Sequence, residues 1–217
     1  MLENILLKYD NPKINFLSGW GQKSDNILNF PYQIDNIDYL SYNSIDKFFH
    51  KLKLQNPQII IGWSLGGQIA INAILQNIIN PKLLILLSTS FQFLSQNSYK
   101  IGVDGKIYDN FCDNLSNNPE KLLKKFHLMM LQGDERFPEL KNQYIYSKNF
   151  DNLQYWLDYL VNFSAFDLNF DNFCPTELIY GKNDQIVNYK QAHLFHEKIK
   201  NSNLSILEKY SHLPFCL

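Results

Sequence analysis

A chain of 217 residues has room for one domain, or for one domain with an inserted subdomain. The formal net charge of −1 gives no whole-molecule case for a nucleic-acid or anionic-membrane partner, and a hydrophobic share of 45% suffices for a sizeable core. The cysteines Cys112, Cys174 and Cys216 lie far apart and form no Cys-x-x-Cys pair, so neither a disulfide framework nor a zinc site is predicted.

The N-terminal residues show no export pattern. Residues 1–10 lack the basic start and long apolar region that are typical of a secretion signal. The longest apolar run, residues 83–87, is far too short to cross a bilayer. We therefore expect a cytoplasmic protein without a membrane span.

Residues 1–90 alternate short apolar runs with helical patterns. Strands are predicted at residues 13–17, 37–40, 58–61 and 83–87, and helices at 45–54, capped by Ser44, and at 65–77. The alternation resumes after residue 170, with strands at 176–180 and 204–207 and a helix at 189–200. This order is typical of an α/β fold with a mostly parallel sheet covered on both faces.

The intervening residues, 91–170, contain no convincing strand. Asn118-Pro119-Glu120 is a good helix start, because it combines a cap, a proline at the first helical position and an acid in the first turn. Two apolar stripes follow at helical spacing: Leu122, Leu123, Phe126, Met129 and Met130, and then Leu153, Trp156, Leu157, Leu160 and Val161. We predict a core of residues 1–90 and 171–217 with a helical lid at 91–170, although plain core packing would also produce such stripes.

The turn around Ser64 combines features of a catalytic site. Gly62-Trp63-Ser64-Leu65-Gly66 places a serine between two glycines, after a predicted strand and before a predicted helix. This pattern resembles the nucleophile elbow of α/β-hydrolases, where a serine projects from a strained turn. The alternative is a glycine-rich turn whose serine only caps the helix. We predict an α/β-hydrolase fold with Ser64 as the nucleophile.

A serine hydroxyl needs a base within hydrogen-bond reach, and the base needs an orienting acid. In α/β-hydrolases these groups follow in the order serine, acid, histidine. Asp184 and His212 satisfy that order, and each comes just after a predicted strand, at the edge where a parallel sheet places its chemistry. We therefore predict the triad Ser64, Asp184 and His212, with a turn-forming role as the alternative for Asp184.

Other acids and histidines compete for these roles. Asp167 and Asp171 come before the predicted strand, at the wrong edge of the sheet. Unlike His212, the remaining histidines do not follow the last strand: His50, His127, His193 and His196. His193 and His196 share a helix face, but they lack a third ligand, so no metal site is predicted. His127 lies in the predicted lid, where it could face the pocket.

The oxyanion of an acyl-transfer intermediate needs N–H donors. The N–H of Leu65, in the first turn of the helix, is one candidate. The second should come from the loop after the first strand, where Trp20 is the candidate and its indole could wall the pocket. The alternative is a structural tryptophan packed over the loop. This chemistry needs no metal and no organic cofactor.

Several of these segments together resemble the pimeloyl-[acyl-carrier protein] methyl ester esterases of biotin synthesis. The segments are Gly19-Trp20-Gly21, Gly62 to Gly67, Leu131-Gln132, Tyr180-Gly181 with Asp184, and His212 with Pro214-Phe215. The elbow and the triad turns are shared across α/β-hydrolases. The Gly-Trp-Gly loop combined with Gly-Trp-Ser-Leu-Gly-Gly is more particular to this esterase family.

The resemblance implies a serine carboxylesterase that cleaves the methyl ester of the pimeloyl carrier protein through an acyl-enzyme. By position it implies substrate contacts at Trp20, Ser64, Leu65, Leu128, Met129, Met130, Leu131, Gln132 and His212. Family lids hold the acyl carrier protein with arginines, and the cations that could substitute here are Lys121, Lys124, Lys125, Arg136 and Lys141. Acids are interleaved with these cations, so a solvated face of mixed charge is the alternative.

The residues leave two other functions open. One is a general carboxylesterase or thioesterase for small acyl groups, which assays with thioesters and methyl esters would separate. The other is a catalytically dead fold that binds an acyl carrier. The intact order of the triad counts against the latter, and absence of fluorophosphonate labelling at Ser64 would support it.

Overall fold

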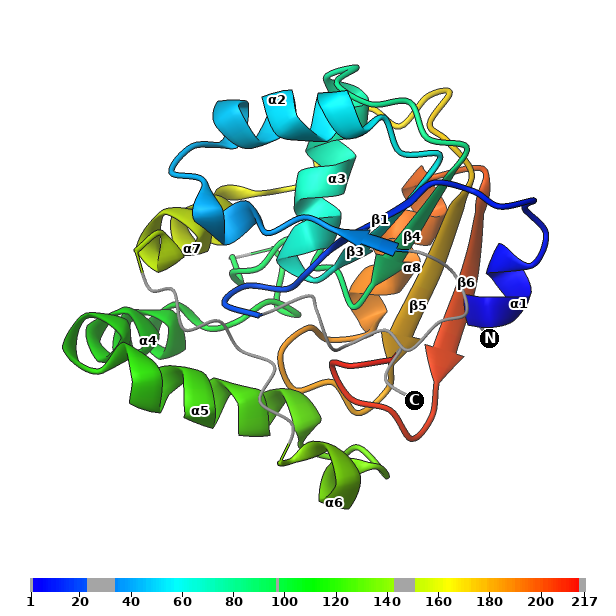
Figure 1. Cartoon of the computed structure of the whole chain (residues 1–217). Helices are drawn as coiled ribbons and strands as arrows, with labels where there is room; N and C mark the ends of the chain where they lie inside the picture. The colour runs from blue at the N-terminus through cyan, green and yellow to red at the C-terminus, as the bar shows by residue number, and fades with distance from the viewer. Residues whose placement is uncertain (1, 23–33, 97, 143–150, 215–217) are drawn as a thin grey trace.

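The computed structural model describes residues 2–22, 34–96, 98–142 and 151–214. Within them one sheet has the order β2-β1-β3-β4-β5-β6, and all of its pairings are parallel. Helices flank this sheet (Figure 1). The strands are β1 (Ile14–Leu17), β2 (Ile34–Asn36), β3 (Ile59–Trp63), β4 (Leu83–Leu87), β5 (Thr176–Gly181) and β6 (Ser202–Leu207).

The described helices include one short 3₁₀ helix, Tyr39–Ser41. The α-helices are α1 (Leu2–Leu6), α2 (Ile45–Gln55), α3 (Leu65–Leu75), α4 (Gly105–Asn117), α5 (Pro119–Leu131), α6 (Phe137–Leu140), α7 (Leu153–Asn162) and α8 (Lys190–Lys198). α3 packs on β1, β3 and β4, and α8 packs on β5 and β6. Because crossovers between parallel strands are right-handed, α2, α3 and α8 lie on one face of the sheet. None of the described helices is long and apolar enough to cross a membrane.

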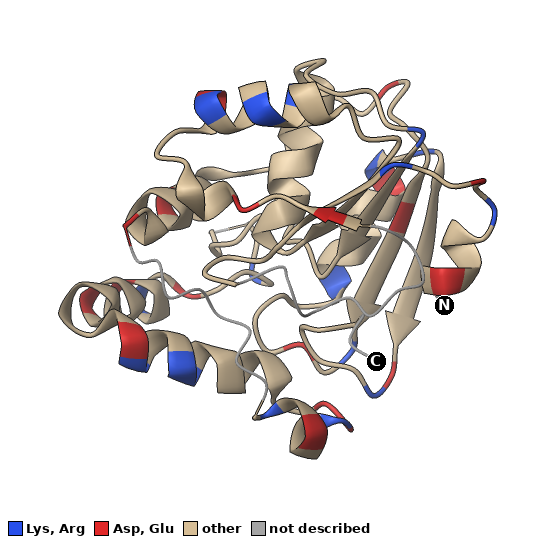
Figure 2. Ribbon diagram, in the orientation of Figure 1, with Lys and Arg blue, Asp and Glu red and all other residues tan. Residues whose placement is uncertain are grey.

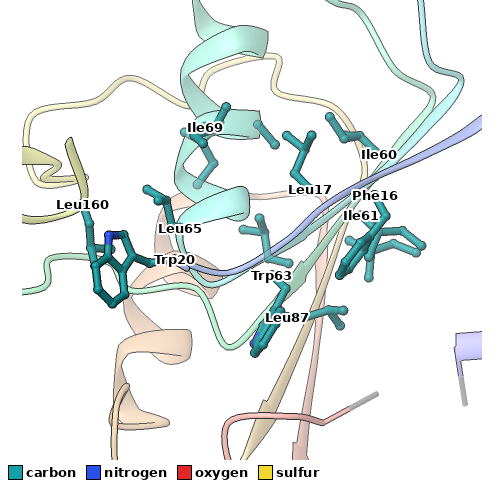
Figure 3. Close-up of a cluster of buried hydrophobic side chains, with 14 of the residues drawn as sticks. Phe16, Leu17, Trp20, Ile60, Ile61, Trp63, Leu65, Ile69, Leu87 and Leu160 are labelled. Carbon is teal, nitrogen blue, oxygen red and sulfur yellow. The ribbon is translucent and has the colours of Figure 1, made fainter. Parts of the chain in front are cut away.

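The centre of the sheet is buried on both faces. All residues of β1, β3 and β4 are buried, and apart from Asn15 of β1 they carry no polar side chain, as expected in a covered parallel sheet. Figure 3 shows part of this core, in which Leu65 and Ile69 of α3 belong to one cluster with Leu17 and Trp63 from the strands. The core therefore holds the ends of β1 and β3 against the start of α3.

All strands of the described sheet point the same way, so the loops that follow them leave from one edge. The paired register extends to the last residues of β1, β3, β4, β5 and β6. The loops after these strands therefore start close together. They contain the predicted site residues Trp20, Ser64, Asp184 and His212.

The connection between β4 and β5 contains α4 to α7. α5 begins where predicted: Pro119 is its first residue, and the Asn118 side chain accepts a hydrogen bond from the Lys121 N–H at 3.1 Å. α4, which was not predicted, packs against α5 (Figure 1). The connection also contains β-bridges that were not predicted: Gln92 with Ser164, Leu94 with Val103, and Gln96 with Tyr99.

The prediction of a strand at residues 37–40 was wrong. The strand is β2, three residues earlier, and it ends where Asp38 starts a 3₁₀ turn. The Asp38 carboxylate accepts hydrogen bonds from the Leu40 N–H at 3.0 Å and from the Ser41 hydroxyl at 2.8 Å. Tyr39 and Leu40 are buried from within this turn, so their apolar character reflects core packing rather than a strand.

Two cysteines, Cys112 and Cys174, are free thiols. Cys216 lies outside the described residues, as does Phe215 of the segment that follows His212.

Candidate active site

The turn between β3 and α3 consists of Ser64 alone. Its backbone lies at φ 53° and ψ −117°, a region that non-glycine residues occupy only under strain. The Ser64 N–H donates to the carbonyl of Leu87 at 2.8 Å, and the Ser64 carbonyl accepts from the Gly67 N–H at 3.0 Å. These bonds hold the serine at the carboxyl edge of the sheet.

The glycines around Ser64 are required by close backbone approach. A Cβ on Gly66 would lie 2.1 Å from the carbonyl oxygen of Leu17, on the neighbouring strand. A Cβ on Gly62 would lie 2.5 Å from Cα of Gly67. Any larger residue would push α3 away from the sheet, so the glycines permit the tight turn at Ser64, which is itself buried.

His212 and Asp184 form a buried pair. His212 Nδ1 lies 2.7 Å from Asp184 Oδ2, and the two side chains are 1% and 0% exposed. The other carboxylate oxygen accepts the N–H groups of Ile186 at 2.7 Å and Val187 at 2.9 Å. Because a carboxylate only accepts, Nδ1 is the protonated nitrogen and Nε2 has a free lone pair that can accept a proton. The hydrogen bonds of the described residues include none from Ser64 Oγ to this ring.

Further contacts fix the backbone of His212. The indole of Trp63 donates to the His212 carbonyl at 2.8 Å, and the two rings lie 5.7 Å apart, centre to centre. The His212 N–H donates to the carbonyl of Met130 at 3.1 Å. Neither supporting role was predicted, because these contacts join residues distant in the chain and leave no periodic signal.

Trp20 packs over its loop, as the structural alternative expected, and it also lines the cavity described below. The role of its backbone N–H as an oxyanion donor stays a prediction. Its indole N–H donates to the carbonyl of Leu153 at 2.9 Å, and its ring packs edge-on against Phe111 and Phe126. Its loop is held by the Tyr39 hydroxyl, which donates to the carbonyl of Gly19 at 2.6 Å. Because Leu65 is the first residue of α3, its N–H has no partner one turn earlier and is available to an anion.

A cavity of about 630 Å³ lies between the connection and the loop after β5. Its apolar wall includes Trp20, Phe111, Phe126, Met129, Leu157 and Leu160, and Figure 3 shows Trp20 beside Leu160. Polar residues at the cavity include Lys100, Lys182 and Asn188. Of the predicted triad, which falls wholly within the described residues, only Asp184 lines this cavity. An apolar cavity that adjoins Asp184 suits an acyl chain.

Comparison with known proteins agrees with the observed fold. The sequence pattern of the family described as the alpha/beta hydrolase fold matches residues 21–217. The chain belongs to the α/β-hydrolase fold family. The predicted fold class is thereby confirmed.

The relatives of this hydrolase include esterases. The pimeloyl-[acyl-carrier protein] methyl ester esterase of Wigglesworthia glossinidia brevipalpis is 30% identical, over 92% of this chain and 86% of that protein. The protein of the same name from Pseudoalteromonas atlantica is 28% identical, over 92% of this chain and 76% of that protein. A solved hydrolase from Oleispira antarctica has a TM-score of 0.75 at 14% identity, over 94% of this chain and 85% of that chain. An esterase from Exiguobacterium antarcticum has a TM-score of 0.72 at 21% identity, over 93% of this chain and 85% of that chain. This hydrolase is a carboxylic ester hydrolase.

The five residues at the end of α5 with implied substrate contacts, Leu128 to Gln132, differ in what surrounds their side chains. Met129 lines the cavity. Met130 and Leu131 are buried in the core, whereas Leu128 and Gln132 are exposed. Helical geometry explains this division, because successive residues of a helix face different directions.

The cations considered for the carrier protein fall into two groups. Arg136 contacts the buried Asp134 carboxylate and the carbonyl of Leu213, so its guanidinium is occupied within this hydrolase. The remaining four have exposed side chains: Lys121, Lys124, Lys125 and Lys141. Lys124 pairs with Glu120 at 3.2 Å. Figure 2 shows one acidic position beside basic ones in the first half of α5, where Glu120 is the only acid.

The competing acids, and three of the four competing histidines, are exposed side chains. Asp171 is exposed and lies 4.0 Å from Lys200, and Asp167 is exposed. The exposed histidines are His50, His193 and His196. Among the described residues no group of three His, Cys, Asp or Glu side chains could hold a metal ion.

His127 is buried in α5 rather than exposed to the cavity. Burial lowers the pKa of His127, and the nearby Leu140 backbone only partly opposes this. Neither ring nitrogen forms a well-aligned hydrogen bond with the described residues. The ring is therefore neutral at neutral pH and behaves as a core side chain.

Proposed function

We propose that this hydrolase is a serine esterase that cleaves the methyl ester of pimeloyl-[acyl-carrier protein], in biotin synthesis, with Ser64, His212 and Asp184 as its triad. The observations that carry the triad are the buried 2.7 Å contact between His212 and Asp184 and the strained elbow conformation of Ser64. The substrate is supported by the names of the relatives, which match over most of the chain.

In the proposed reaction Ser64 Oγ attacks the ester carbonyl while His212 Nε2 takes its proton. Asp184 orients the imidazole and stabilises the imidazolium that forms. The carbonyl oxygen becomes an oxyanion, which accepts the N–H groups of Trp20 and Leu65. His212 returns the proton to the departing methanol. A water molecule, deprotonated by the same ring, then attacks the acyl carbon. The bond to Ser64 Oγ breaks, His212 returns the proton to Oγ, and the free acid leaves. Protein groups and water supply every step.

The connection between β4 and β5 is proposed to act as the lid of this site. Its helices supply much of the apolar wall of the cavity, including Met129 and Leu157. The acyl chain would lie against that wall. The carrier protein would then approach α5, whose outer face presents the exposed lysines Lys121, Lys124 and Lys125.

The proposed substrate predicts genetic rescue. A bacterium that requires biotin because it lacks its own methyl esterase should grow without biotin when it expresses the wild-type chain, and should fail to grow with Ser64→Ala. Purified protein should release methanol from the carrier-bound ester. The substrate assignment is wrong if the wild type hydrolyses p-nitrophenyl esters but neither rescues growth nor cleaves the carrier-bound ester; the esterase class would then still stand.

Charge reversal on α5 tests the contact with the carrier. Changing Lys121, Lys124 and Lys125 together to Glu should strongly lower kcat/KM for the carrier-bound ester, because steering and phosphate contacts are lost. Hydrolysis of small esters should be nearly unchanged. The loss should shrink at high salt, since exposed charges are screened and contribute about 1 kcal/mol or less each.

A matched control is available on α2, where Lys47, Lys51 and Lys53 are also exposed. Changing these three lysines together to Glu should leave kcat/KM unchanged for both the carrier-bound ester and the small esters. Equal loss with both substrates in the α5 variant would mean that the lid has been destabilised. No change at low salt would mean that α5 does not meet the carrier.

One observation favours a general carboxylesterase as the second candidate. The guanidinium of Arg136 is bound to Asp134 and Leu213, so it is not positioned to hold a carrier phosphate. The lysines that remain lack the bidentate geometry of arginine. Comparison of kcat/KM for free and carrier-bound esters separates the two candidates.

A further inference from the structure

The end of α5 and the residues after it are bonded to the loop that contains His212, residues 209–213. The His212 N–H donates to the carbonyl of Met130 at 3.1 Å, and the Glu135 N–H donates to the carbonyl of Lys209 at 3.1 Å. These bonds tie two segments that lie far apart in the sequence. They place residues 130–136 directly behind the proposed base.

Asp134 forms the centre of this contact. Its side chain is 0% exposed, and its Oδ2 accepts both the N–H and the hydroxyl of Ser211 at 2.9 Å each. Arg136 donates to the same carboxylate from Nε at 2.8 Å and from Nη2 at 2.9 Å. Nη2 also donates to the carbonyl of Leu213 at 2.7 Å. The two neighbours of His212 in the chain are thus both anchored to the pair Asp134–Arg136.

The carboxylate is suited to a fixed contact because it stays charged. Burial by itself raises the pKa of Asp134, but the hydrogen bonds from Arg136 and from the Ser211 N–H together outweigh it and lower the pKa below its ordinary value. Arg136 is held in turn by the ring of Tyr210, which lies 4.1 Å below its guanidinium carbon. Charge-assisted hydrogen bonds of this kind are short and strongly directional.

We propose that Asp134 is a positioning residue for His212, with Arg136 as its partner. This inference rests on the proposed triad. The imidazole must stay within reach of both Asp184 and Ser64, and anchoring Ser211 and Leu213 fixes the backbone on each side of it. The connection between β4 and β5 would then help to build the catalytic site as well as cover it.

The test uses Asp134→Asn and Ser211→Ala in the full chain. Ser211→Ala removes one hydroxyl donor and retains the backbone bond, so it is the milder change. Glu135→Gln is the matched control, because Glu135 belongs to the same segment and forms an exposed ion pair with Lys209 at 3.2 Å. For each variant kcat and KM for a p-nitrophenyl ester, the rate of Ser64 labelling by a fluorophosphonate, and the Tm would be measured.

We expect Asp134→Asn to lower kcat and the labelling rate by about 10- to 100-fold, since displacing a reacting group by 1 Å has effects of this size. Ser211→Ala should lower both several-fold, and KM should stay within two-fold in both variants. Measurements at a temperature well below each Tm separate positioning from unfolding. If Asp134→Asn does not fold, the kcat and labelling rate of Ser211→Ala decide whether the inference holds.

Unchanged kcat and labelling in the folded variants, with only a lower Tm, would overturn the inference and leave Asp134 a purely structural residue. A parallel loss in Glu135→Gln would also overturn it. If the wild type itself is neither labelled nor active, the proposed triad fails instead, so the two failures are distinguishable.

Discussion

Replacing Ser64 by alanine is expected to lower kcat by on the order of 10⁴- to 10⁶-fold, because the triad acts as a unit and no other group can form the acyl-enzyme. Alanine has the same backbone preferences as serine at φ 53°, so the turn and the fold should be retained. Hydrolysis of p-nitrophenyl esters measures the rate, and thermal unfolding measures the fold.

The control for this variant is Ser205→Ala. Ser205 is half-buried within β6, which β4 and β5 separate from β3 and its elbow in the sheet. Its replacement should leave kcat within two-fold of the wild type. Near wild-type hydrolysis by Ser64→Ala would falsify the proposed triad, whatever the control shows.

Changing Asp184 to asparagine should lower kcat by about 10⁴-fold with little change in KM. The Oδ1 side of this group accepts two backbone N–H groups, from Ile186 and Val187, so an asparagine would keep its amide oxygen there. Its NH₂ would then face His212 Nδ1. Because an amide NH₂ can only donate a hydrogen bond, Nδ1 would have to accept it with its lone pair. The proton would move to Nε2, and the ring could no longer act as a base toward Ser64.

Asp171→Asn and Asp167→Asn are the matched controls, since both side chains are exposed. Asp171 lies 4.0 Å from Lys200, and an exposed pair of this kind contributes about 1 kcal/mol or less to stability. Neither control should change kcat. If one of them were the damaging substitution and Asp184→Asn were not, the assignment of the orienting acid would be wrong.

The local sequence pattern was enough to predict an element where the segment can bury its side chains in only one way. β4 matches its predicted residues 83–87, because an uninterrupted aliphatic run bounded by turn residues fits only the centre of a parallel sheet. α5 begins at the predicted Asn118 cap for an equally local reason, since cap and proline act within one turn.

Local pattern failed where long-range packing overrides propensity. α4 contains several Asn and Asp residues, which are weak helix formers, and its stability comes from packing Phe111 and Leu115 against neighbouring elements. Residues 37–40 are apolar because Tyr39 and Leu40 reach the core from a turn, which mimics a short strand in the sequence.

The sequence by itself determined the order of the strands along the chain and the residues that follow them. Chain order is enough to nominate Ser64, Asp184 and His212, because parallel strands end at one edge of a sheet. Only the tertiary structure brings Asp184 and His212 to 2.7 Å, and only it joins Asp134 to Ser211 across 77 positions of the chain. Hydrogen bonds between residues that far apart depend on how whole elements pack, and no periodicity or spacing in the sequence records them.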